Sequence, residues 1–327
     1  MVILELVERV GWAAEGDLVT VPLDSAADRE QVVAWCDRTG NTLVAADDRT
    51  ATVLRGRAPD PVASLPADRV PGARLWLYTN FDCNLACDYC CVRSSPRTPR
   101  RALGLDRIRA IALQAPGAGV AEFLLTGGEP FMLPDLDEIV VACTSALPTT
   151  LLTNGMLFRG HRLEMLRAMP RDRLRVQISI DSATPGRHDM HRGAGSWAKA
   201  VAGVHIALAE GFTVRVAATL TTNDLQEEHE LRDFLDSLGI AREHQIVRQL
   251  AHRGAAESGI ELTVETLVPE VTITADGAYW HPVGADDDDQ LVTTEIFPLA
   301  ATIERVRELY REHHRAAAQA ARTFTCA

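Results

Sequence analysis

The stretch Phe81-Asp82-Cys83-Asn84-Leu85-Ala86-Cys87-Asp88-Tyr89-Cys90 contains three cysteines with the spacing C-x3-C-x2-C. It directly follows an apolar run, Leu75-Trp76-Leu77-Tyr78, whose composition predicts a β-strand. Thiolates are soft ligands that select iron–sulfur clusters, zinc or Cu(I). A [4Fe–4S] cluster normally takes four thiolates. Three thiolates from one loop therefore leave one iron of such a cluster open to a small molecule.

The composition is that of an ordinary globular protein: 327 residues, 46% hydrophobic and 24% charged. The net charge of −12 argues against a nucleic-acid scaffold, which normally presents a basic face. The N-terminus shows no signal pattern and no apolar run reaches membrane-spanning length, so neither nucleic acid nor a membrane is expected as a partner. Four of the seven cysteines fall within residues 83–91, which favours reduced thiols serving as ligands in a cytoplasmic protein.

Strand-like and helix-like segments alternate six times after residue 74, and this alternation predicts a parallel sheet with helices on its outer face. Six units are too few for a closed eight-stranded barrel, so we expect an α/β fold built on an open, partial (β/α)6 TIM-like barrel. Functional groups of such sheets collect at the carboxyl ends of the strands. Four motifs follow these strands: the cysteine loop, Gly-Gly-Glu-Pro (127–130), Thr-Asn-Gly (153–155) and Ser-Ile-Asp-Ser (179–182). The expected strands are 74–79, 121–125, 149–152, 175–180, 213–220 and 245–249.

The pattern predicts four regions. Residues 1–60 read as a small α/β domain, 61–73 as a proline-rich linker, 74–255 as the partial barrel and 256–327 as a C-terminal extension. Within the extension we expect a hairpin over 270–281, with an Asp-Gly turn, and a helix over 300–321. The acidic run 286–289 between them reads as a solvated loop.

The cysteine loop together with the downstream Gly127-Gly128-Glu129-Pro130 resembles the radical S-adenosylmethionine (SAM) superfamily, over about residues 74–250. The resemblance implies one [4Fe–4S] cluster held by Cys83, Cys87 and Cys90, with SAM chelating the fourth iron. It further implies that such a cluster, once reduced, would cleave SAM to a 5′-deoxyadenosyl radical that abstracts a hydrogen atom from the substrate. An electron donor such as flavodoxin or ferredoxin is implied as a partner, and the enzyme would be of the oxidoreductase or maturase type.

The resemblance also implies a site for the methionine part of SAM. Its amino group is held in the family by the turn that corresponds to Thr126, Gly127, Gly128 and Glu129. Glycines allow the backbone to approach a ligand closely. A plain strand-to-helix turn is the alternative interpretation.

Five further residues are expected at the same site. Period-two alternation places Ser179 and Asp181 on one face of a strand, where family members bind the ribose or the methionine carboxylate, although Asp181 can also cap the next element. Arg192 lies in a His-Asp-x-x-Arg element whose arginine meets the SAM carboxylate in relatives. Tyr89 is the aromatic residue before the third cysteine. Asn154 ends a strand and either faces the cofactor or forms the turn. His188 and His191 are expected in a loop.

Zinc is the alternative occupant of the three cysteines, but it usually takes a fourth thiolate or histidine, and none is evident in the sequence. A non-catalytic iron–sulfur or zinc protein that keeps the barrel as a binding module is the alternative function. Cys91 is expected to point away from the cluster, and Cys143 to lie in the core.

Both ends of the chain carry weaker resemblances. Residues 29–41 resemble the second half of TusA-like sulfur-carrier domains, without their reactive Cys-Pro motif, so Cys36 is expected to be a buried structural thiol. The extension resembles a degenerate SPASM/twitch-like domain. It has Trp280-His281-Pro282 where an auxiliary cluster cysteine often follows, and only Cys326 remains downstream. We therefore expect a single cluster, with the substrate, a peptide or a small metabolite, unidentified.

Overall fold

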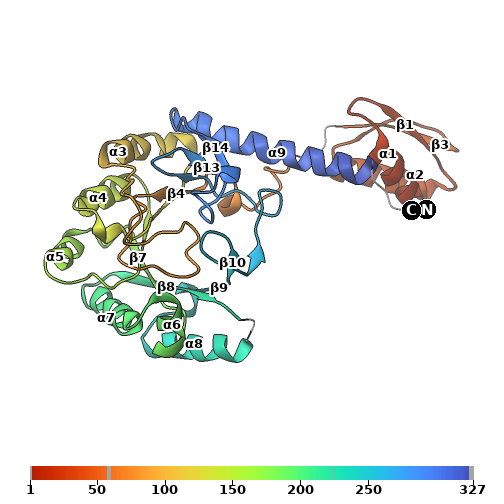
Figure 1. Cartoon of the computed structure of the whole chain (residues 1–327). Coiled ribbons are helices and arrows are strands. Elements are labelled where there is room, and N and C mark those ends of the chain that lie inside the picture. The colour runs from red at the N-terminus through yellow and green to blue at the C-terminus, as the bar shows by residue number, and fades with distance from the viewer. Residues whose placement is uncertain (1, 57–59, 223, 324–327) are drawn as a thin grey trace. The chain divides into compact units, whose positions relative to one another are not determined.

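The computed structural model describes residues 2–56, 60–222 and 224–323 (Figure 1). Cys326 lies outside these residues. The chain divides into two compact units. One unit contains the residues up to Pro66 together with the chain from Leu309 onward, and the other is Ala67–Glu308.

The N-terminal unit is a three-stranded antiparallel sheet with two helices. The sheet has the order β1-β3-β2, and the mixture of helices and strands agrees with the small α/β domain expected from the sequence. Ser25 caps the second helix by accepting from the backbone N of Asp28, and Gly40 ends it with φ 68°, a left-handed conformation that glycine adopts without strain. The elements are α1 (Val2–Trp12), β1 (Leu18–Pro22), α2 (Ala26–Thr39), β2 (Thr42–Ala46) and β3 (Thr50–Leu54).

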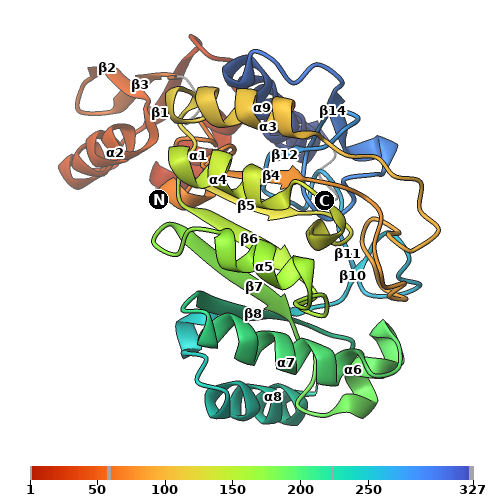
Figure 2. The ribbon, with the colours of Figure 1, turned by 90° about the vertical axis from the view of Figure 1, so that its left-hand side faces the viewer.

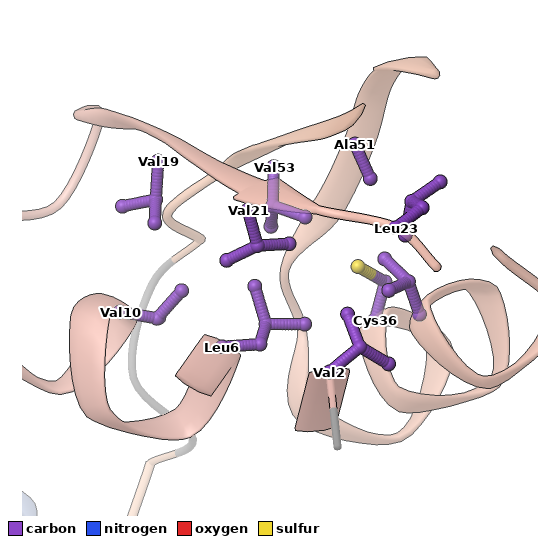
Figure 3. Close-up of a cluster of buried hydrophobic side chains, with 10 residues drawn as sticks. Val2, Leu6, Val10, Val19, Val21, Leu23, Cys36, Ala51 and Val53 are labelled. Atoms are coloured by element: carbon purple, nitrogen blue, oxygen red, sulfur yellow. The ribbon is translucent and has the colours of Figure 1, made fainter. Parts of the chain in front are cut away.

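The core of this unit is made by the inward faces of both helices and the sheet (Figure 3). Alternate residues of β1 and β3 point to one side, as the period of two in a strand requires. The side chain of Cys36 lies inside this cluster at 3% exposure, and burial raises its thiol pKa. Cys36 therefore packs as a small apolar side chain, as the sequence predicted.

Six parallel strands form the centre of the larger unit, in the order of the chain. All six predicted strands are present, and no closed barrel forms in the described part of the chain. The strands are β4 (Arg74–Tyr78), β5 (Glu122–Thr126), β6 (Thr149–Thr153), β7 (Leu174–Ser179), β8 (Thr213–Leu220) and β9 (Gln245–Gln249).

Helices between the strands cover one face of this sheet (Figure 2). This is the arrangement that parallel strands require, because each strand must return through a crossover connection. The crossover helices are α3 (Leu105–Gln114), α4 (Leu136–Ala146), α5 (His161–Ala168), α6 (Pro185–Arg192), α7 (Ser196–Ala209) and α8 (Leu225–Ser237). Short 3-10 turns lie at Ala67–Arg69, Pro116–Ala118, Pro130–Met132, Arg242–His244 and Asp288–Gln290. Cys143 is fully buried on α4, as predicted.

The C-terminal extension continues the same sheet beyond β4. The predicted hairpin consists of β12 (Thr272–Ile273) and β13 (Ala278–Tyr279), and β12 pairs in parallel with β4. With β14 (Leu291–Thr293) the sheet has nine strands in the order β14-β13-β12-β4-β5-β6-β7-β8-β9. β10 (Ala251–His252) and β11 (Ile260–Glu261) form a separate pair, and α9 (Leu299–Thr323) is the last helix.

The acidic run in the extension is not simply a solvated loop, and that prediction was wrong. Asp287 forms an ion pair with Arg93 at 2.9 Å and a second with Arg253 at 3.4 Å. Asp286 lies 3.5 Å from the same Arg93, and Asp289 lies 3.0 Å from Arg253. The run therefore connects the extension to the loop that contains the three cysteines.

Among the described residues, no helix combines the length and the apolar character needed to cross a bilayer.

Candidate active site

The cysteine loop joins β4 to α3 and lies at the carboxyl ends of the strands (Figure 2). Its first turn is fixed by Phe81, which is fully buried, stacks on Tyr78 with ring centroids 5.4 Å apart and lies 4.1 Å below the guanidinium of Arg101. Cys83, Cys87 and Cys90 are free thiols that line one cavity of about 520 Å³. The three predicted ligands therefore line the same cavity.

These thiols are largely enclosed. Burial raises the pKa of Cys83 to about 12 and that of Cys87 to about 11. Within the described residues, no three His, Cys, Asp or Glu side chains come together tightly enough to hold one metal ion. A cubane cluster does not need that convergence, because each thiolate binds a different iron. Three thiolates suffice for a cubane with one iron left open, whereas zinc usually takes a fourth thiolate or histidine.

Cys91 also lines this cavity, and the expectation that it points away from the cluster stays a prediction. Its sulfur is 3.9 Å from the hydroxyl of Tyr78, which in turn donates a 2.7 Å hydrogen bond to the carbonyl of Pro282. Burial raises the pKa of the Cys91 thiol to about 11. Cys91 thus contacts Tyr78 of β4, which is itself bonded to Pro282 of the extension.

Thr126, Gly127 and Gly128 line the cavity at the end of β5. The backbone N of Gly128 donates to the carbonyl of Asn80 at 2.9 Å. A Cβ atom on Gly127 would lie 2.5 Å from Oδ1 of Asn80, and one on Gly128 would lie 2.2 Å from the carbonyl oxygen of Asp82. Both glycines are therefore required by contact with the cysteine loop, a reason that the sequence did not reveal.

Glu129 is fully buried and does not line the cavity. Its carboxylate accepts from the hydroxyl of Thr153 at 2.7 Å, from the backbone N of Asn154 at 2.8 Å and from the backbone N of Phe131 at 3.1 Å. Burial raises its pKa, although these donors act in the opposite direction. The side chain therefore fixes the end of β6 against the end of β5.

Asn154 forms the turn that the sequence predicted and also lines the cavity. Its side chain lines the cavity and donates to Oδ1 of Asn84 at 2.8 Å. Its own Oδ1 accepts from the backbone N of Met156 at 3.0 Å, which closes the turn.

Ser179 and Arg192 line the cavity, whereas Asp181 lies behind them at 5% exposure. The Asp181 carboxylate receives two hydrogen bonds from Arg192, at 2.5 and 3.2 Å, one from the hydroxyl of Tyr89 and one from the backbone N of Thr219 at 3.0 Å. Burial alone would raise the pKa of Asp181, but the guanidinium and the other donors hold it below its usual value. Asp181 thus positions Arg192 and Tyr89, both of which face the cavity.

The two histidines before Arg192 lie on helix α6, so the prediction of a loop was wrong. His188 is buried at 1% exposure, and its Nδ1 accepts from the backbone N of Asp181 at 3.2 Å. Burial lowers its pKa to about 4, which keeps the ring neutral. His191 contacts Asp88 of the cysteine loop at 3.0 Å.

The sequence missed three further residues that line the cavity. Thr219 lies one residue before the end of β8, pairs in register with Arg248 of β9, and both line the cavity. His281 reaches the same cavity from the extension. The strand-end position of Thr219 and Arg248 was a usable signal. His281 gave none, because its place depends on the pairing of β12 with β4.

Comparison with known proteins identifies the class of site. Residues 77–238 match the model of the radical SAM superfamily. The chain is 33% identical over 162 residues to the antilisterial bacteriocin subtilosin biosynthesis protein AlbA of Bacillus subtilis, a match that covers 48% of this chain and 35% of AlbA. It is 32% identical over 164 residues to the AdoMet-dependent heme synthase of Methanosarcina barkeri, covering 50% of this chain and 46% of that protein. The chain thus spans less than half the length of these two relatives.

The fold is also similar to a solved structure. Streptococcus suis SuiB bound to its precursor peptide SuiA aligns with a TM-score of 0.51 and 23% identity, over 60% of this chain and 44% of SuiB. At this identity the likeness concerns the fold.

Proposed function

Because residues 77–238 are a radical SAM domain, we propose that the chain is a radical SAM enzyme acting on a substrate that enters the cavity at the strand ends. The observation that carries the proposal is the composition of that cavity. All three loop cysteines share it with the Gly-Gly turn, Asn154, Ser179 and Arg192. These groups line one cavity in the described part of the chain, so no rearrangement is needed to bring them together.

The residues fit the expected cofactors. Cys83, Cys87 and Cys90 would hold three irons of a [4Fe–4S] cluster, and a three-thiolate set leaves the fourth iron for SAM. Reductive cleavage of SAM to a radical that removes a hydrogen atom from the substrate is the chemistry that the cluster supplies when bound. The electron would come from a donor such as flavodoxin or ferredoxin.

The chain's own groups orient SAM and limit access to it. Thr126, Gly127 and Gly128 line the cavity, and carbonyl groups of this turn would accept from the methionine amino group. The guanidinium of Arg192, fixed by Asp181, would meet the methionine carboxylate. Ser179 lines the same cavity, and its hydroxyl would accept from or donate to the ribose.

The similarity to AlbA, named for bacteriocin biosynthesis, supports a peptide as the substrate, and the similarity to a heme synthase supports a small metabolite. The N-terminal unit would then dock a leader peptide or a carrier protein. The same proposal includes three further points. The N-terminal unit is TusA-like, and the extension is a degenerate SPASM/twitch-like domain. The boundaries between regions lie near residues 60, 73 and 255.

Anaerobic reconstitution tests the proposed activity. The protein is loaded with iron and sulfide, and 5′-deoxyadenosine is measured after addition of SAM and dithionite. We expect 5′-deoxyadenosine to form in proportion to the cluster content. A preparation that holds a complete cubane and forms none contradicts the enzyme and favours a non-catalytic iron–sulfur protein.

A further inference from the structure

The charges around the cavity are unbalanced. None of the described lining residues is an aspartate or glutamate, although the whole chain has a net charge of −12. Two lining residues are arginines, Arg192 and Arg248. Arg192 is neutralised by Asp181, with 2.5 Å between Nε and Oδ2. The positive charge of Arg248 has no such partner.

Arg248 is the one exposed residue of β9. In the part of the chain that the structure describes, its guanidinium has neither an ion pair nor a hydrogen bond. The register of β9 with β8 places it beside Thr219, which also lines the cavity. Exposed arginines on an outer surface are commonly unpaired, but this one faces the cavity that contains the cysteines.

His281 adds a second donor on the same wall. The backbone N of Val283 donates to its Nδ1 at 3.1 Å, so the proton of the neutral ring lies on Nε2. Burial lowers the pKa of His281 to about 4, and the positive charge of Arg248 acts in the same direction. The nearby carboxylate of Glu270 is already bonded to Arg74 and to the indole N–H of Trp76, both at 2.5 Å.

Leu250, Ile260, Leu262 and Val283 add apolar side chains to the cavity lining here, and Thr219 and Gln249 add polar ones. A guanidinium and a neutral imidazole N–H beside apolar side chains match a ligand with an anionic group attached to an apolar body. Arginine binds planar or tetrahedral oxyanions through two parallel hydrogen bonds, which a neutral amide cannot reproduce.

We propose that Arg248 and His281 form the anion-binding part of the substrate site, so that the substrate carries a carboxylate or phosphate group next to an apolar portion. This inference rests on the proposed function, since it places the substrate in the cavity that the SAM-binding residues also line. It adds a chemical class to a substrate that was otherwise unspecified.

Calorimetric titration of the reconstituted protein tests the inference. SAM is titrated first, and benzoate, phenyl phosphate and benzamide are then titrated into the SAM-loaded protein. We expect at least one of the two anions to bind at least about 10-fold more tightly than benzamide, because a charged hydrogen-bonded pair is lost in the amide. The stronger anion identifies the group as a carboxylate or a phosphate.

Three variants localise the effect. Arg248→Gln should weaken binding of the preferred anion by roughly 10- to 100-fold, with the affinity for SAM unchanged, and Arg248→Lys should restore part of it. Arg109→Gln removes the same charge from α3, where Arg109 pairs with Glu138 at 2.8 Å, and should leave anion binding unchanged.

Other results overturn the inference. Equal binding of the anions and benzamide, or unchanged anion binding in Arg248→Gln, shows that Arg248 does not hold an anion. Loss of SAM affinity in Arg248→Gln assigns the residue to SAM and leaves the proposed function intact. Absence of SAM binding in the wild-type protein contradicts the proposed function together with the inference.

Discussion

Arg192 and Asp181 form a buried ion pair in which Nε lies 2.5 Å from Oδ2. Arg192 faces the cavity and Asp181 lies behind it, so Arg192 can contact a ligand while Asp181 holds the guanidinium in position. The carboxylate also receives the hydroxyl of Tyr89, whose ring lies 5.5 Å from the guanidinium carbon. One buried carboxylate thus fixes two side chains of the proposed SAM site.

Replacing Asp181 by alanine should destabilise the larger unit. Arg192, 12% exposed at the cavity, would lose its counter-charge. Breaking a fully buried pair costs about 3–5 kcal/mol, and the access of Arg192 to the cavity lowers the cost below that range. We expect a lower midpoint of thermal unfolding, together with weaker SAM binding in the protein that stays folded. The double variant Asp181→Asn with Arg192→Gln should recover part of the stability, because no unpaired charge remains. Equal stability of wild type and Asp181→Ala contradicts a buried pair.

Substitution of single cysteines should separate the cluster ligands from their neighbour. Cys87→Ala should abolish binding of a [4Fe–4S] cluster, whereas Cys91→Ala should leave it intact, because Cys91 contacts Tyr78 on the wall shared with the extension. Iron and acid-labile sulfide per chain are measured after anaerobic reconstitution. Equal loss of iron in both variants contradicts the assignment of ligands.

Gly128→Ala should disturb the cysteine loop without touching any cysteine. The added Cβ would lie 2.2 Å from the carbonyl oxygen of Asp82, so the loop and the turn must separate. We expect impaired cluster loading. Gly117→Ala is the matched control, since no atom lies within 4 Å of a Cβ built there. The same cluster content in both variants contradicts the proposed contact.

His188 should make the stability of the larger unit depend on pH. Its pKa is lowered from 6.5 to about 4 by burial, so the unfolded chain takes up a proton that the folded chain does not. The stabilisation is complete above pH 6.5 and falls as the pH decreases toward 4, by at most about 3 kcal/mol.

The charged neighbours of His188 are Asp181, Asp189 and Arg192. Burial also lowers the pKa of His281, which therefore contributes to the same pH dependence. His188→Asn keeps an acceptor for the backbone N of Asp181 and should flatten this part of the pH profile, measured by denaturant unfolding. An unchanged slope in this variant contradicts a neutral buried His188.

Most of the fold could be predicted from the order of strands and helices, because the alternation of apolar and polar residues is visible in the sequence. Gln245–Gln249 was expected as a strand and is β9. The polar residues at strand ends also converge as expected, because parallel strands bring their carboxyl ends to one edge. The direction of each side chain there was harder to infer. Glu129 turns inward because three donors surround it, and that depends on residues 24 and 25 positions away.

Contacts that are distant in sequence could not be predicted. His281 reaches the cavity because β12 pairs with β4, nearly two hundred residues earlier in the chain. The acidic run looked solvated because Arg93 and Arg253, its partners, lie in other segments. Such pairings leave no periodic signal in the sequence.

The two edge strands of the nine-stranded sheet, β14 and β9, are not paired with each other in the described chain. The interior of a closed barrel is filled by packed side chains, so a substrate can reach the site only over the rim formed by the strand-end loops. An open sheet can accept an internal segment of a chain from the side. If the substrate is a peptide, the residue to be modified therefore does not have to be terminal, and flanking residues on both sides can stay outside while that residue lies against the wall formed by β9.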